Sequence, residues 1–66
     1  MINEAQVLKV VKSVTNTNAY FSNGTLVLET ADSKIAVSVF NAIWESEEVA
    51  LVFGKSGNET VYEFLA

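Results

Sequence analysis

The sequence predicts an α+β domain in which an N-terminal helix packs on one face of a four- to five-stranded antiparallel meander sheet. Apolar residues recur every three or four positions over residues 3–14, which indicates a helix. After residue 18 they recur mostly at every second position, which indicates strands. Turn-forming residues separate these later segments, and short connections favour pairing of consecutive strands. A small SH3-like or OB-like barrel with the helix closing one end is the alternative.

The first predicted element is the helix over residues 3–14. Asn3 is a favourable N-cap residue, and Gln6 three positions later completes a capping-box pattern. Because valines favour strands, a strand over residues 7–14 is the alternative, which the helical periodicity disfavours. The apolar stripe of the helix is formed by Ala5, Val7, Leu8, Val11 and Val14.

The sheet is predicted to contain strands at residues 19–22, 25–30, 34–44, 49–53 and 59–65. Asn23 and Gly24 join the first two strands, and both residues tolerate the positive φ angles of a type I′ turn. Residues 54–58 have the composition of the last turn. The segment FNAIWESEEVALVFG, residues 40–54, is predicted to form the central hairpin with an acidic tip. A short helix over residues 41–50 is the alternative.

The sheet face turned away from the helix is predicted to be too apolar for a monomer. Large contiguous apolar patches are rare on monomers, so we expect another chain to cover this outer face and favour a homodimer. Coverage by another protein or curling of the sheet are the alternatives. Aromatic side chains are expected to anchor the interface. The predicted interface residues are Phe40, Ala42, Trp44, Ala50, Val52 and Val61.

The residue types exclude several kinds of chemistry. The 66 residues include no Cys and no His, so disulfides, thiolate catalysis and imidazole zinc sites are ruled out, and no metal site or cofactor is predicted. The four basic residues are all lysines and the net charge is −4, which disfavours nucleic acid as a partner. Gly54-Lys55-Ser56 matches the end of the P-loop pattern, but Val49 replaces its earlier glycine and a strand follows. No catalytic residues are therefore predicted, and the protein is not expected to be an enzyme.

Residues 1–66 are predicted to form a single domain in the cytoplasm. The first residues lack the basic-then-apolar layout of a signal peptide. No apolar run approaches the ~20 residues of a membrane span, so a membrane is not an expected partner.

The sequence therefore predicts a non-enzymatic, small protein-binding module of the accessory or inhibitor type, acting as a homodimer. A first alternative is an acidic mimic of nucleic acid that inhibits a nuclease or a DNA-binding protein, with an acidic patch formed by Glu45, Glu47 and Glu48. A second alternative is a single-stranded nucleic-acid binder on which bases would stack. Its stacking residues would be Tyr20, Phe21, Trp44 and Tyr62.

Overall fold

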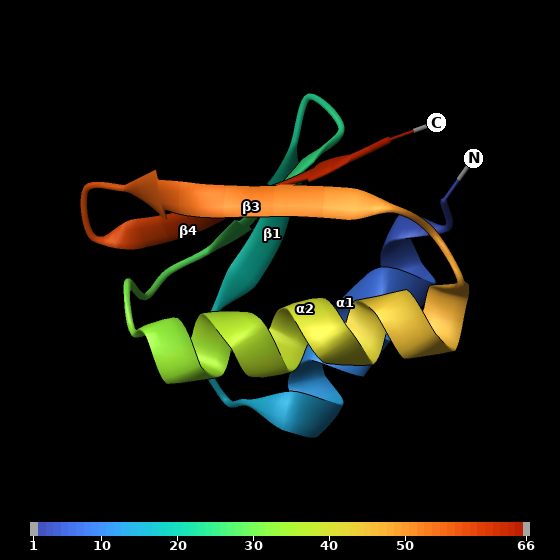
Figure 1. Ribbon diagram of the computed structural model, residues 1–66, viewed down its shortest axis with the longest axis horizontal. Helices are drawn as coiled ribbons and strands as arrows, with labels where there is room; N and C mark the ends of the chain where they lie inside the picture. Colours follow the sequence, from blue (N-terminus) through green and yellow to red (C-terminus); the bar gives the residue numbers. More distant parts are fainter. Residues whose placement is uncertain (1, 66) are drawn as a thin grey trace.

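Two helices cover one face of a four-stranded antiparallel sheet in the computed structural model, which describes residues 2–65 (Figure 1). In chain order the elements are α1 (Glu4–Val14), β1 (Ala19–Ser22), β2 (Thr25–Leu28), α2 (Ser33–Glu47), β3 (Leu51–Ser56) and β4 (Glu59–Phe64). The predicted α+β class, with an N-terminal helix and an antiparallel sheet, is confirmed. A second helix, α2, lies between β2 and β3 in the chain, whereas the predicted order was one helix followed only by strands.

The first helix and the first hairpin follow the local signals in the sequence. The Asn3 side chain accepts a hydrogen bond from the backbone N–H of Gln6 at 3.1 Å, so the predicted N-cap of α1 is confirmed. Asn23 and Gly24 have φ angles of 53° and 78°, as the predicted type I′ turn between β1 and β2 requires. In both places a short-range interaction decides the local structure.

Residues 34–44 are helical, so the predicted strand there is wrong. The carboxylate of Asp32 caps α2 by accepting hydrogen bonds from the backbone N–H groups of Lys34 (2.9 Å) and Ile35 (3.4 Å). The positions 35, 39 and 43 are four residues apart, a spacing that fits a period of two as well as the helical period. The residues of α2 that are buried in the core are Ala36, Val39 and Ile43.

The predicted central hairpin over residues 40–54 is also wrong. Its first arm belongs to α2, and the acidic segment lies at the C-terminal end of that helix. Glu48 ends α2 in the left-handed conformation, with φ 51° and ψ 44°. Residues 54–56, which were predicted to belong to the last turn, lie in β3, so the β3–β4 turn is limited to residues 57 and 58, where Gly57 has a φ of 62°.

The strand order β1-β2-β4-β3 differs from a meander. Two hairpins are joined through the antiparallel pair of β2 and β4, so β4 returns to the centre of the sheet. The intervening α2 carries the chain to the far side of the sheet before β3 begins (Figure 1). As a result β3 is an edge strand that lies above α2 and has no partner strand on its outer side within residues 2–65.

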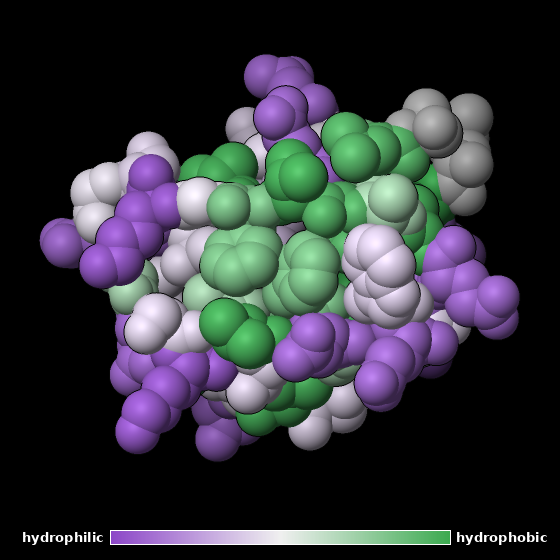
Figure 2. Space-filling model, in the orientation of Figure 1, coloured by the Kyte–Doolittle hydropathy of each residue, from purple (hydrophilic) through white to green (hydrophobic). Residues whose placement is uncertain are grey.

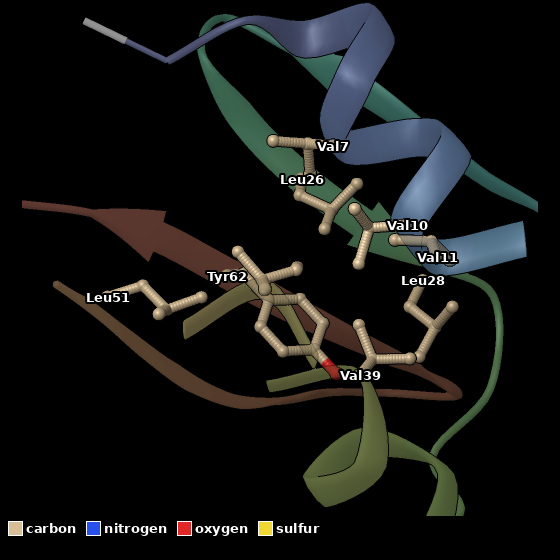
Figure 3. Close-up of a cluster of buried hydrophobic side chains, with 9 residues drawn as sticks. Val7, Val10, Val11, Leu26, Leu28, Val39, Leu51 and Tyr62 are labelled. Atoms are coloured by element: carbon tan, nitrogen blue, oxygen red, sulfur yellow. The ribbon is translucent and has the colours of Figure 1, made fainter. Parts of the chain in front are cut away.

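The core lies between the helices and the sheet, where side chains of both helices meet those of the central strands (Figure 3). Tyr62 of β4 is fully buried there, and its hydroxyl donates a hydrogen bond of 2.7 Å to the backbone carbonyl of Ala36 in α2. Burial raises the pKa of the Tyr62 hydroxyl well above its ordinary value. This bond fixes α2 against the sheet. The residues of the cluster are Val7, Val10, Val11, Leu26, Leu28, Val39, Ile43, Leu51 and Tyr62.

Candidate functional site

The most unusual surface of the molecule lies where α2 meets the edge strand β3. The ring centroids of Phe40 and Phe53 are 5.1 Å apart, and those of Phe40 and Trp44 are 5.8 Å apart. Val37 precedes Phe40 by one helical turn on the same side of α2. We call the surface formed by Val37, Phe40, Trp44 and Phe53 the α2/β3 face.

The side chains of the α2/β3 face are far more exposed than those of the core. The exposed fraction is 50 % for Trp44, 45 % for Val37 and 39 % for Phe53. Figure 2 shows apolar side chains gathered across the middle of this side of the molecule, between β3 and α2, with hydrophilic side chains around them. Contiguous apolar surface of this kind on a small protein is typical of an interaction site.

Contacts in the core set the orientation of α2 and therefore the positions of the side chains on the α2/β3 face. The buried positions 36, 39 and 43 orient α2, so positions 37, 40 and 44 form a second stripe on the flank of the helix beside β3. Phe53 pairs with Tyr62 across the strands, and the two rings are 5.4 Å apart. Because Tyr62 is also bonded to α2 through Ala36, the aromatic side chains of the face are held on rigid elements.

Charged residues lie at the two ends of the α2/β3 face. Lys34 is in the first turn of α2, where it borders a depression shared with Val14 and Thr15 at the end of α1. Glu45, Glu47 and Glu48 are at the C-terminal end of α2. Glu45 and Glu48 line a shallow depression together with Trp44. The acids therefore border the aromatic side chains directly.

Lys55 lies at the same end of the face as Lys34. α2 and β3 run in opposite directions, so the start of the helix lies below the end of the strand (Figure 1). Lys55 pairs with Thr60, whose hydroxyl donates a 2.7 Å hydrogen bond to the carbonyl of Thr30, two residues before the N-cap Asp32. The face thus has a lysine-bearing end, an apolar middle and an acidic end.

This charge arrangement opposes the dipole of α2. A helix is stabilised by acids in its first turn and by bases in its last turn. The first turn of α2 contains no acidic residue and its last turn contains no basic residue. The acids at its C-terminal end therefore lower the stability of the helix.

The six predicted interface residues do not share one face. Phe40 and Trp44 lie on the α2/β3 face, and Ala42 lies on α2 partly buried against the core. Val52 and Val61 point to the outer face of the sheet, away from the helices. The sixth residue, Ala50, is exposed in the segment between α2 and β3. The predicted common outer face is wrong because residues 40–44 are helical.

The outer face of the sheet is more polar than the sequence predicted. Cross-strand pairing places Tyr20, Val27 and Val61 in one row across it, and Val27 is buried among its neighbours. The pKa of the Tyr20 hydroxyl is raised above its ordinary value, mainly by the negative charge of Glu59. Partial burial and the charge of Glu29 raise it further. The apolar row is therefore bordered by acids.

The rings proposed as a stacking surface for single-stranded nucleic acid are dispersed. Tyr62 is fully buried. Tyr20 and Phe21 are adjacent in β1 and so point to opposite faces of the sheet, and Phe21 stacks on Phe64 at 6.0 Å. Trp44 lies on α2 instead. The four rings therefore do not form one platform.

Sequence reasoning missed four residues of the α2/β3 face and its ends: Val37, Phe53, Lys34 and Lys55. The signal for Val37 was present, because positions 37, 40 and 44 have helical spacing. The other three depend on how α2 lies against β3, which is a long-range contact.

Comparisons with known proteins give no relative for this chain: no protein-family model, no curated protein and no solved structure matches it. Within residues 2–65, no group of three or more acidic side chains is arranged to hold a metal ion. No helix of this part of the chain is long and apolar enough to cross a membrane.

Proposed function

We propose that this chain is a small, non-enzymatic protein-binding module and that it binds its partner through the α2/β3 face. The observation that carries the proposal is the contiguous set of exposed apolar side chains on a helix and a strand, in which the ring of Phe40 lies against those of Trp44 and Phe53. Large aromatic side chains held in place before binding contribute most of the energy of protein interfaces. An accessory or inhibitory role fits a module of this size.

The edge strand adds a second reason for a protein partner. β3 exposes backbone N–H and C=O groups along its outer side, next to the aromatic side chains. An open strand edge attracts other polypeptide chains, and proteins normally blunt or cover it. A partner on the α2/β3 face would cover the edge and the apolar side chains together.

A binding role also suits the available side chains. The sequence lacks His and Cys, the usual proton shuttle and thiol nucleophile. The lysines and the acids around the face are solvent-exposed or half-buried, rather than enclosed in a cleft where their reactivity would change. These features favour recognition over catalysis.

Capture from an extract of the cells that produce this chain tests the proposal. The wild-type chain is immobilised beside Trp44→Ser and beside Val52→Thr, a matched control on the outer face that is equally exposed at 50 %. We expect wild type and the control to retain the same proteins and Trp44→Ser to lose them. Identical sets of retained proteins on all three chains would refute the proposal, provided that each variant keeps the wild-type circular dichroism spectrum.

A further inference from the structure

We propose that the occupant of the α2/β3 face is a second copy of this chain. In this dimer a two-fold axis sets the two α2 helices antiparallel and brings the two β3 edges face to face. The inference rests on the proposed function, since it names the partner of that same face. Two-fold dimers use the same surface of both copies, so the surface must complement itself.

The charges of the face complement themselves under this rotation. Lys34 and Lys55 lie at one end, and Glu45 and Glu48 lie at the other. An antiparallel arrangement brings the lysine-bearing end of each copy onto the acidic end of the other. The arrangement also sets the positive end of one helix dipole beside the negative end of the other.

A two-fold axis parallel to α2 gives the opposite result. It would place the acidic end of one copy on the acidic end of the other, and the lysines on the lysines. Like charges brought together in an interface strongly disfavour association. The distribution of charge therefore selects the antiparallel arrangement.

The apolar side chains are centred for the same symmetry. α2 spans Ser33–Glu47, so Phe40 is its middle residue and would lie beside the axis. Val37 and Trp44 lie on either side of Phe40 at similar distances along the helix, so each would face the other residue of the second copy. The three most exposed contributors to the face, Val37, Trp44 and Phe53, would thereby be buried.

An interface of ordinary size would cover only part of the surface of this chain. A stable interface buries roughly 800 Å² per partner. That is about a fifth of the 4232 Å² of accessible surface of this chain. A chain of this length buries only roughly 60 % of the surface of its unfolded form, so it gains much of its missing core by association.

The acids at the end of α2 gain an explanation in the dimer. In the isolated chain they oppose the helix dipole. In the dimer they face the lysines of the second copy. A basic peptide of another protein would use the acidic end alone and leave Lys34 and Lys55 without a role, so reversing the lysines separates the two occupants.

Sedimentation equilibrium between about 1 and 100 μM tests the proposal, because interfaces of standard size have micromolar or tighter affinities and would be populated in this range. Two charge-reversed chains are compared with wild type: Lys34→Glu with Lys55→Glu, and Glu45→Lys with Glu48→Lys. The helical substitutions Lys34→Glu, Glu45→Lys and Glu48→Lys bring α2 closer to the charge pattern that its dipole favours, so both chains are expected to fold. Lys9→Glu with Lys12→Glu on α1 is the control with the same change in charge as the first chain.

Wild type and the control are expected to form the same dimer. Each reversed chain alone should associate at least about tenfold more weakly, because like charges then meet at both ends. An equimolar mixture of the two should restore the wild-type affinity, because every contact between the ends again joins opposite charges. Trp44→Ser should weaken the dimer by about 30-fold, as the loss of a central aromatic anchor does.

Two results would overturn the inference. One is a wild-type chain that stays monomeric over the whole range, and the other is a dimer that both reversed chains form as tightly as wild type. If wild type is monomeric but captures another protein through Trp44, the second copy is the wrong partner and the proposed function stands. If Trp44→Ser changes neither the dimer nor the capture, both proposals are wrong.

Discussion

Replacing Tyr62 with Phe removes one oxygen atom that joins α2 to the sheet. The hydroxyl is fully buried and donates a 2.7 Å hydrogen bond to the carbonyl of Ala36. A bond of this kind contributes about 1 kcal/mol to the free energy of unfolding. For a domain of this size the melting temperature should fall by about 4–8 °C.

The same substitution has a pH signature. Burial raises the pKa of Tyr62 above its ordinary value of 10.0, so above pH 10 the unfolded chain loses this proton and the folded chain keeps it. The stabilisation from Tyr62 is therefore fully present below pH 10. It is lost as the pH rises above 10, at up to about 1.4 kcal/mol per pH unit. The advantage of wild type over Tyr62→Phe should vanish near pH ~11.

Urea unfolding followed by circular dichroism between pH 7 and pH 11 measures both effects. The two chains are compared at the same concentration, because association adds to the apparent stability. Tyr20→Phe is the matched control: it removes a hydroxyl from an exposed ring on the outer face, so it should not change the stability at neutral pH. If Tyr62→Phe matches wild type in stability at pH 7 and in its alkaline slope, the bond between α2 and β4 does not hold the fold as described.

Three further predictions concern α2. Asp32→Ala removes the cap over the N–H groups of Lys34 and Ile35 and should lower the free energy of unfolding by about 1 kcal/mol; an unchanged urea midpoint would rule the cap out. Glu48→Gly relieves the left-handed φ of 51° and should raise thermal stability by about 1 kcal/mol, whereas a lower melting temperature would show that this conformation carries no strain. Glu45→Lys should stabilise the monomer at high dilution by ~0.3–1 kcal/mol while weakening self-association. A monomer that is less stable than wild type, together with unchanged self-association, would contradict the role assigned to the acidic end.

The parts of the fold that depend on local chemistry could be predicted from the sequence. Asn3 specifies the start of α1, and Asn23 with Gly24 specifies the first hairpin, because each acts through neighbours in the chain. A local signal for α2 was also present, because Asp32 is a favourable N-cap residue and Ala36, Val39 and Ile43 have helical spacing. The alternating pattern of the β-branched residues masked that signal, since a spacing of four fits both periods.

The candidate site could be predicted only in part. Phe40 and Trp44 were selected as interface residues, and the structure places them on the α2/β3 face. Their expected neighbours, Val52 and Val61, point to the other side of the sheet. The contact of Phe40 with Phe53 depends on how α2 crosses below β3, and no local pattern encodes that crossing.

The relocation of the acidic segment also changes its interpretation. At the tip of a hairpin, Glu45, Glu47 and Glu48 would be a solvated cluster without a structural neighbour. At the end of α2 they border Trp44 and complement the lysines at the opposite end of the same face. The role proposed for these acidic residues therefore rests on the side chains around them and not on the acidic composition of the segment.

Acrylamide quenching of Trp44 fluorescence across a dilution series tests most directly whether the α2/β3 face is the binding surface. Trp44 is the only tryptophan of the chain, and half of its side chain is exposed. We predict that quenching decreases as the wild-type concentration rises from about 1 to 100 μM, and that it stays constant for Lys34→Glu with Lys55→Glu. Quenching of wild type that equals the quenching of Lys34→Glu with Lys55→Glu at every concentration would show that Trp44 is not covered by a second copy.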